Sequence, residues 1–308
     1  MIAVPLDAVK KYCPVDGRRQ RVLQSPFKEP MSILLAGLSA LLYGAADFCG
    51  GMAVRKAPLP AVIASSQAVG LAVAVVASLA FGFPLETPLD LAWGALAGVS
   101  GAAGIAALYY ALATTVVAVA SPLAAVTGAA IPVLLGVAAG ERPGLAAWVG
   151  ICLGVCAIGL LTVEPSKGSR DGAVRRAGLL GVLAGLGFGL FFFSISRTTH
   201  GSGLWPLVAA RVATVSLVTV YLLVARKPVR LSRRSVPLVV FSGALDMGAN
   251  IAFLLASRIG MLSISAAVAA LYPGPTVILA WIILRERVTA PRVIGLALAL
   301  AGVALIST

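Results

Sequence analysis

The sequence predicts an all-α integral membrane protein with ten transmembrane helices in two inverted five-helix repeats. The chain has 308 residues, of which 60% are hydrophobic and only 11% charged, whereas a soluble domain carries about 25% charged residues. Apolar runs of about 20 residues, the length that spans a bilayer as a helix, recur along the chain. They show no period-2 alternation, which argues against a transmembrane barrel.

The repeat is visible as a constant offset. Two long apolar runs end at Glu141-Arg142 and Glu286-Arg287, which lie 145 positions apart, and at the same offset Gly44 falls on Gly189. One unit therefore occurs twice along the chain. Because each unit has an odd number of predicted spans, the second enters the membrane in the opposite sense. Such an inverted repeat is common in secondary transporters.

In chain order, a polar tail at 1–31, expected to be disordered, precedes the first repeat at 32–163, and a linker at 164–176 leads to the second repeat at 177–307. The predicted spans are 32–54, 60–82, 91–112, 116–139, 144–163, 177–197, 204–225, 235–256, 261–284 and 291–307. The charge-free stretch from Leu91 to Gly140 would be too long for one crossing, so it is divided near Thr114-Thr115. Met31 directly precedes the first span, which leaves the true start open between Met1 and Met31.

Small residues and prolines suggest how the spans pack. Gly94 and Gly98, like the pairs at 150/154 and 181/185, form small-xxx-small patterns that let helices approach closely. Prolines lie inside the fourth span (Pro122, Pro132) and the ninth span (Pro273, Pro275). Matching interruptions in corresponding spans predict a cavity lined by the first, third, fourth, sixth, eighth and ninth spans. The glutamates that end the two apolar runs are expected to cap and anchor helix ends.

Three ionisable residues fall inside predicted spans: Asp47, Arg211 and Asp246. Each costs a few kcal/mol when it faces lipid, so each is expected to face the bundle interior. Tyr43 lies four positions before Asp47, and Asn250 four positions after Asp246, so each carboxylate has a polar neighbour on its own face. One alternative is an Arg211–Asp246 ion pair that only fixes helix register. Another is a snorkelling Asp47 near its span end. The functional alternative is a coupling acid or a counter-charge to substrate.

The complete set of candidate substrate or coupling residues is Asp47, Tyr43, Gln67, Tyr109, Arg211, Asp246, Asn250 and Tyr272. The aromatic members are also compatible with an interface belt or plain packing. If Asp246 acts in transport, the Asp246→Asn variant is expected to lose transport while reaching the membrane in normal amounts.

Several other classes are disfavoured by the composition. The net charge of +13 comes from basic residues in the breaks between apolar runs, which is a topology pattern and not a nucleic-acid stripe. Four cysteines and a single histidine, His200, indicate neither a metal site nor a catalytic constellation. No phosphate-binding Gly-rich loop with Lys-Ser/Thr is present, so ATP drive within this chain is not expected. We predict no cofactor, with a small molecule and the bilayer as partners and a homodimer as an open alternative.

At these residues the chain resembles the EamA-type members of the drug/metabolite transporter superfamily. The resemblance rests on the two Glu-Arg endings, the first-span stretch 43–48, and Leu204-Trp205-Pro206 leading to Arg211. It implies a central cavity and alternating-access transport of a small amino-acid-like or drug-like metabolite, often export, with proton coupling as one energy source. The family often has an Arg in the second span as well, where this chain has Gln67. A lipid-handling carrier and, with less support, an intramembrane enzyme are the alternatives.

Two arguments disagree on the orientation of the chain in the expected plasma membrane. Breaks after odd-numbered spans, together with the span ends beside them, hold fourteen basic residues, and those after even-numbered spans hold three, to which the tail adds six. Basic loops favour the cytoplasm, so the loops alone place the start of the first span outside. The resemblance instead implies two cytoplasmic termini, and we follow it. A reporter fusion at Thr308 distinguishes the two.

Overall fold

A computed structural model describes residues 28–84, 88–114, 117–162, 171–226, 229–284 and 290–306, and the regular elements in these ranges are all helices. The helices are α3 (Lys28–Val54), α4 (Leu59–Ala80), α5 (Pro88–Thr114), α6 (Val117–Ala138), α7 (Leu145–Thr162), α8 (Asp171–Ser196), α9 (Trp205–Val224), α10 (Val236–Ile259), α11 (Leu262–Ala269), α12 (Pro273–Leu284) and α13 (Ala290–Ile306). Residues 1–27 of the polar tail lie outside the described residues, as does the Glu286-Arg287 ending. Residues 28–31, predicted as the end of the disordered tail, instead form the first turn of α3, and residues 171–176 of the predicted linker belong to α8.

Within the part of the chain that the structure describes, seven segments are long and apolar enough to cross a membrane. They are α3, α4, α5, α8, α9, α10 and the combined segment Leu262–Ile283, which contains α11 and most of α12. The described parts of α6, α7 and α13 contribute shorter apolar helices. The all-helical, multi-pass membrane class is therefore confirmed, while the count of ten crossings stays a prediction.

The proline-containing spans differ from each other. The ninth span is interrupted, because α11 ends at Ala269 and α12 begins at Pro273. The fourth span is one helix, α6, which runs through both Pro122 and Pro132, so the prediction of matching interruptions is wrong for this span. In the ninth span Pro273 and Pro275 stand close together at a helix start, where a missing N–H costs nothing. The two prolines of α6 are ten positions apart, and the helix continues across each of them.

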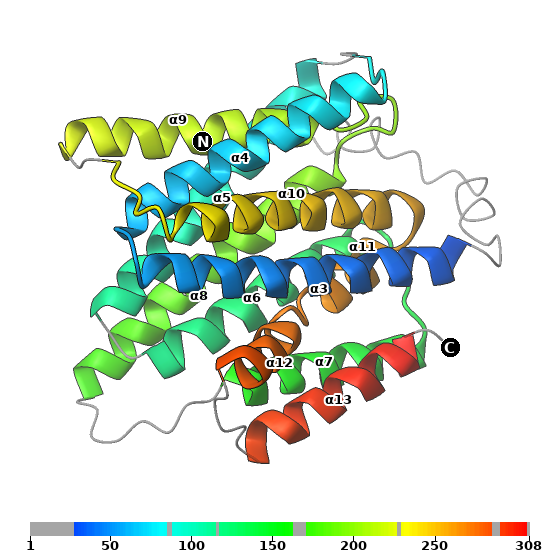
Figure 1. The fold of residues 1–308 in the computed structure, drawn as a ribbon. Helices are drawn as coiled ribbons and strands as arrows, with labels where there is room; N and C mark the ends of the chain where they lie inside the picture. Colours follow the sequence, from blue (N-terminus) through cyan, green and yellow to red (C-terminus); the bar gives the residue numbers. More distant parts are fainter. Residues whose placement is uncertain are drawn as a thin grey trace, which may run out of the picture.

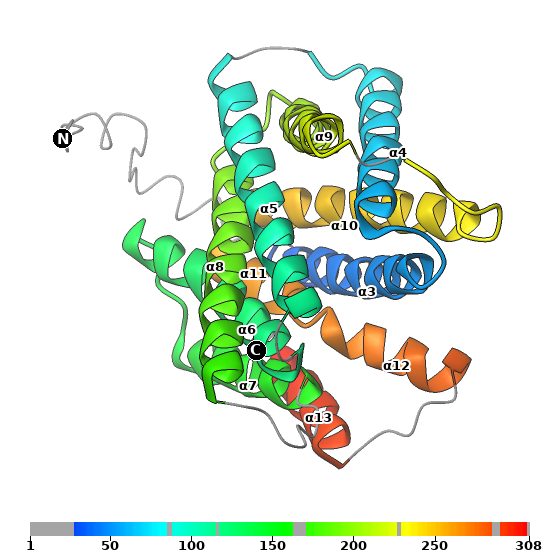
Figure 2. The same ribbon diagram turned by 90° about the vertical axis from the view of Figure 1, so that its left-hand side faces the viewer.

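The bundle has a simple arrangement in both views (Figures 1 and 2). Helices α4 and α9 lie at one edge, α3 and α10 pack side by side in the middle, and α7 and α13 pack together at the opposite edge. Helices α5 and α8 pack against each other on one flank, and α8 also packs on α6. Each of these contacts joins a helix of the first predicted repeat to one of the second.

Contacts recur at the offset seen in the sequence. The α3–α10 contact corresponds to the α8–α5 contact, and α5–α9 corresponds to α10–α4. At residue level, the Thr276 hydroxyl donates to the Gly44 carbonyl at 3.0 Å. The equivalent positions are Ile131 and Gly189, and Ile131 packs directly against Gly189. The two halves thus exchange places in the same contacts, which is the pattern of a two-fold relation.

The helix termini define two ends of the bundle. We call one the Trp205 end, where α3, α5, α9 and α11 begin and α4, α6, α8 and α10 end. There the Trp205 indole donates to the Phe83 carbonyl at 2.8 Å, and Arg258 donates to the Thr199 carbonyl at 2.7 Å. We call the opposite end the Val54 end.

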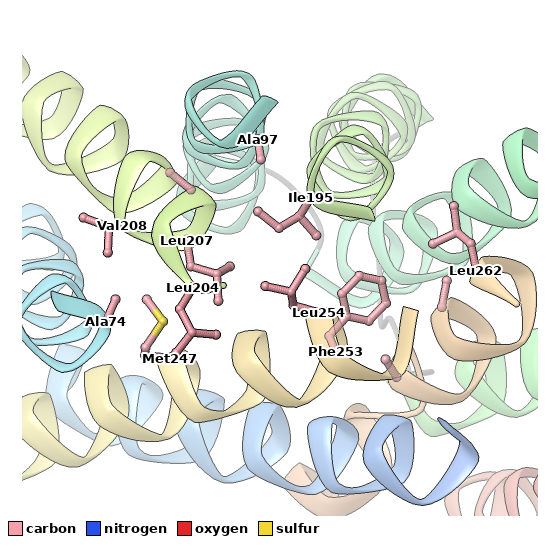
Figure 3. Close-up of a cluster of buried hydrophobic side chains, with 13 residues drawn as sticks. Ala74, Ala97, Ile195, Leu204, Leu207, Val208, Met247, Phe253, Leu254 and Leu262 are labelled. Carbon is pink, nitrogen blue, oxygen red and sulfur yellow. The ribbon is translucent and has the colours of Figure 1, made fainter. Parts of the chain in front are cut away.

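The largest buried apolar cluster lies toward the Trp205 end (Figure 3). Figure 3 shows Leu207 from α9 with Leu204 directly before that helix, Phe253 and Leu254 from α10, and Ile195 from α8. All five side chains are at most 3% exposed. This packing closes the interior of the bundle at the Trp205 end.

Close helix approach at α5 predicts a sharp glycine requirement. A methyl group at Gly98 would run into the Ala210 carbonyl, and one at Gly94 into the Pro206 carbonyl, both of which are backbone. We expect Gly98→Ala to lower stability by about 1–3 kcal/mol, the usual cost of overpacking. Thermal melting of the purified protein in detergent measures it. Gly37→Ala is the control, because nothing lies within 4 Å of a methyl group there. Equal melting of the two variants would contradict this account of α5–α9 packing.

Candidate functional site

A cavity of about 200 Å³ lies between the helices. Helices α3, α5, α6, α8 and α10 and the α11–α12 break line it, which are the six spans the sequence predicts. Helices α4 and α9 line it as well; these two spans were not among the six, although their residues Gln67 and Arg211 were predicted candidates. They enter the wall because they carry the buried polar residues Gln67 and Arg211.

Arg211 joins three helices at the cavity wall. From α9 it donates to the Gln67 side-chain oxygen on α4 and forms an ion pair with Asp246 on α10. The Arg211 side chain is 7% exposed and that of Asp246 26%. A guanidinium with two oxygen acceptors is a satisfied buried charge. The carboxylate of Asp246 keeps part of its surface on the cavity.

Asn250 follows one helical turn after Asp246 on the same face of α10. Its amide nitrogen donates to the Asp246 carbonyl at 2.7 Å, as the spacing of four residues allows. Its side-chain oxygen is buried and has no hydrogen-bond partner among the described residues. A buried acceptor at a cavity wall without a partner is costly. It is therefore available to a ligand that donates a hydrogen bond.

Asp47 and Tyr43 reach the cavity from α3. The Asp47 side chain is exposed, and within the described residues it has neither a hydrogen bond nor an ion pair. The Tyr43 ring lies edge-on to two other rings. The distance between ring centroids is 6.3 Å to Tyr272 and 6.1 Å to Phe192. Of the other sequence candidates, Tyr272 lines the cavity at the α11–α12 break, whereas the Tyr109 side chain lies outside the described residues.

The opposite wall is apolar and was not identified as a site from the sequence. It consists of Gly101, Ile105 and Leu108 on α5, Ala124, Gly128 and Ala129 on α6, and Phe188, Phe191 and Phe192 on α8. The available signal was the pairing of glycines with aromatic residues. Gly101 and Gly128 leave room for the large α8 side chains, since a methyl group at Gly101 would lie 3.1 Å from Phe191.

A polar network crosses the Trp205 end. Asp90, only 2% exposed, accepts from the Thr199 amide at 3.0 Å and from its hydroxyl at 2.6 Å. Arg258 adds donations to the Thr198 hydroxyl at 3.2 Å and the Ser202 hydroxyl at 3.3 Å. These bonds tie the start of α5 and the end of α10 to the segment between α8 and α9.

Glu141 makes a second connection at this end. Its carboxylate accepts from the Leu262 amide at 2.6 Å and the Ser263 amide at 2.9 Å, the first two amides of α11. The expected capping role is therefore found, but on a helix of the other repeat and not on Glu141's own. A carboxylate at a helix start is stabilised by unpaired amides and by the helix dipole. The bond fastens the α6–α7 turn to α11.

Comparison with known proteins assigns this chain to a family. The EamA-like transporter family matches residues 30–163 and again residues 175–308. The chain belongs to the EamA-like transporter family. The family match thus falls once on each half of the chain, and it makes this chain a multi-pass membrane transporter.

Structural similarity agrees with the EamA-like fold. A solved crystal structure of a protein matches 89% of this chain and 96% of its own chain, with a TM-score of 0.75 at 18% sequence identity. At that identity the likeness concerns the fold alone. No curated protein matches the sequence.

Proposed function

We propose that this EamA-like protein exports a small metabolite across the plasma membrane by alternating access through the central cavity. The observation that carries the proposal is the convergence of Asp47, Arg211, Asp246 and Asn250 on one cavity. Ionisable residues within membrane spans are retained where they serve a substrate or ion pathway. The apolar cluster and the polar network close the Trp205 end, and we infer from this that the cavity opens toward the Val54 end.

The exchanged contacts support the two-state part of the proposal. Ten crossings in two inverted repeats would let one repeat rock against the other around a fixed site. Asp90 and Arg258 of this network have no charged counterparts at the other end, because the offset carries them to Ser235 and Ala113. This difference favours the conformation that is closed at the Trp205 end. A conformational change then needs Glu141 and Arg258 to release their partners.

Direction and energy supply follow from the orientation that we adopt. Figure 1 places the start of α3 and the end of α13 at the same end of the bundle. With both termini cytoplasmic, the Trp205 end faces the cytoplasm and the cavity faces outward. Asp47 is the candidate coupling acid, since it is the cavity carboxylate without an ion-pair partner among the described residues.

Cavity size bears on the alternatives. A volume of about 200 Å³ corresponds to roughly seven water molecules at ~30 Å³ each. A membrane lipid with two acyl chains is far larger, so a lipid-handling carrier is less well supported. An intramembrane enzyme would need a nucleophile and base in contact, and the polar cavity residues consist of an ion pair, amides, hydroxyls and a separate carboxylate.

Filling the cavity tests the transport route. Ile63 on α4 lines the cavity, so Ile63→Trp is expected to lower transport at least about tenfold by occupying the space needed for substrate. Efflux of a metabolite panel from a deletion strain, followed by uptake into proteoliposomes, measures it. Val76→Trp is the control on the same helix, because Val76 is 66% exposed on the outer surface. Transport that survives Ile63→Trp unchanged would place the route elsewhere.

A further inference from the structure

We propose that the cavity binds a compact organic cation, an ammonium group carried on an apolar and preferably aromatic group. This inference rests on the proposed function and names its substrate class. It follows from the free charges, the free hydrogen-bonding groups and the separation of polar from apolar residues in the cavity.

One carboxylate in the cavity has no counter-charge among the described residues. Arg211 and Asp246 neutralise each other as an ion pair. The Arg211 guanidinium is also bonded to Gln67 and is 7% exposed, so it offers little surface to an anion. Asp47 has no such partner and is exposed at the cavity wall. Because this carboxylate has no counter-charge of its own, a cation beside it is favoured over a neutral or anionic group.

The free hydrogen-bonding groups point the same way. The buried Asn250 side-chain oxygen lacks a donor among the described residues, and the Asp47 carboxylate can only accept. Both residues line the same cavity, on the adjacent helices α3 and α10. An ammonium group supplies up to three donors and no acceptor. A carboxylate ligand would instead bring further acceptors beside these two acceptor groups.

Aromatic rings add a second attraction for a cation. Tyr43 packs edge-on between Tyr272 and Phe192, and Phe192 continues to Phe191 at 5.5 Å. These four rings all line the cavity and connect its polar and apolar walls. A cation within about 6 Å of a ring face gains about 0.5–2 kcal/mol.

The two walls differ although the repeats are related. At the 145-residue offset Asp47 falls on Phe192 and Asn250 on Ile105, and both of these counterparts line the cavity. Tyr43 likewise falls on Phe188, another cavity residue. Related positions thus provide acceptors on the α3–α10 wall and apolar surface on the α5–α8 wall. A ligand that satisfies both has a cationic head and an apolar body.

The experiment compares three small probes of nearly equal size and shape but different charge: benzylamine, benzyl alcohol and benzoate. Binding to the purified protein at neutral pH is measured by calorimetry. Benzylamine is expected to bind at least about tenfold more tightly than the other two, since an ion pair is worth a tenfold step or more here. Benzoate or benzyl alcohol binding as tightly as benzylamine overturns the inference without the use of any variant.

Two variants test whether Asp47 is the source of the preference for benzylamine. Asp47→Asn keeps the shape of the side chain and is expected to weaken benzylamine at least about tenfold while leaving benzyl alcohol unchanged. Glu29→Gln removes a carboxylate from the same helix far from the cavity and should change neither. Unchanged benzylamine binding in Asp47→Asn, with melting and gel filtration as in wild type, overturns the inference.

Counterflow of the same probes in proteoliposomes separates this inference from the proposed function. Selective benzylamine movement supports both. Movement of benzyl alcohol or benzoate in place of benzylamine overturns the substrate class and leaves the transporter. Benzylamine binding without movement of any probe supports the substrate class and counts against transport.

Discussion

The Asp246→Asn variant is expected to reach the membrane in normal amounts, to melt at a lower temperature and to lose transport. Membrane insertion depends on span hydropathy, which this change leaves almost unaltered. The folded state becomes less stable, because the Arg211 side chain is 7% exposed and cannot lose its charge by deprotonation. Leaving one charge of a buried pair without its partner typically costs about 3–5 kcal/mol.

A double-mutant cycle separates the structural role of this pair from its transport role. Arg211→Gln combined with Asp246→Asn removes both charges and should recover most of the lost stability, since no buried charge is left unpaired. Melting temperature and transport are measured for both single variants and the double variant. We expect the double variant to be stable but inactive. Recovery of transport together with stability would show that the pair only fixes helix register.

The fold was predictable because lipid imposes strict rules. Long apolar runs in this chain allow few structures other than helices, and charges inside such runs must face the interior. Asp47, Arg211 and Asp246 could therefore be selected one by one from the sequence, and the structure brings all three to one cavity. Their partners were harder to infer. Gln67 meets Arg211 across two repeats, a contact that depends on helix rotation and not on spacing along the chain.

Other features could not be predicted from the sequence, for related reasons. The apolar wall around Phe188 and Phe192 has only an unspecific sequence signal, the pairing of glycines with aromatic residues, because aromatic residues in spans are as common in packing as in cavities. The helix breaks before Pro273 but continues through Pro132, and proline content alone does not distinguish the two cases. The bond from Glu141 to α11 joins the two repeats and could not be read from either repeat alone.

The Glu141→Ala variant is expected to open the Trp205 end. Its carboxylate makes two charge-assisted bonds to the first amides of α11, and such bonds contribute about 1.5–3 kcal/mol each. Losing them destabilises the conformation closed at this end by enough to shift its population at least about tenfold. Transport should fall because the cavity no longer closes fully at the Trp205 end, while the amount of protein in the membrane stays normal.

A cysteine reporter makes the shift measurable. Ala266 on α11 is 1% exposed, so Ala266→Cys in a background without the native cysteines should react slowly with a small thiol reagent. Adding Glu141→Ala should speed the reaction at least about tenfold, in proportion to the open population. Arg142→Ala is the control, since Arg142 is the exposed neighbour of Glu141. If the thiol stays slow while transport stays normal, the Glu141 carboxylate is a helix cap with no part in gating.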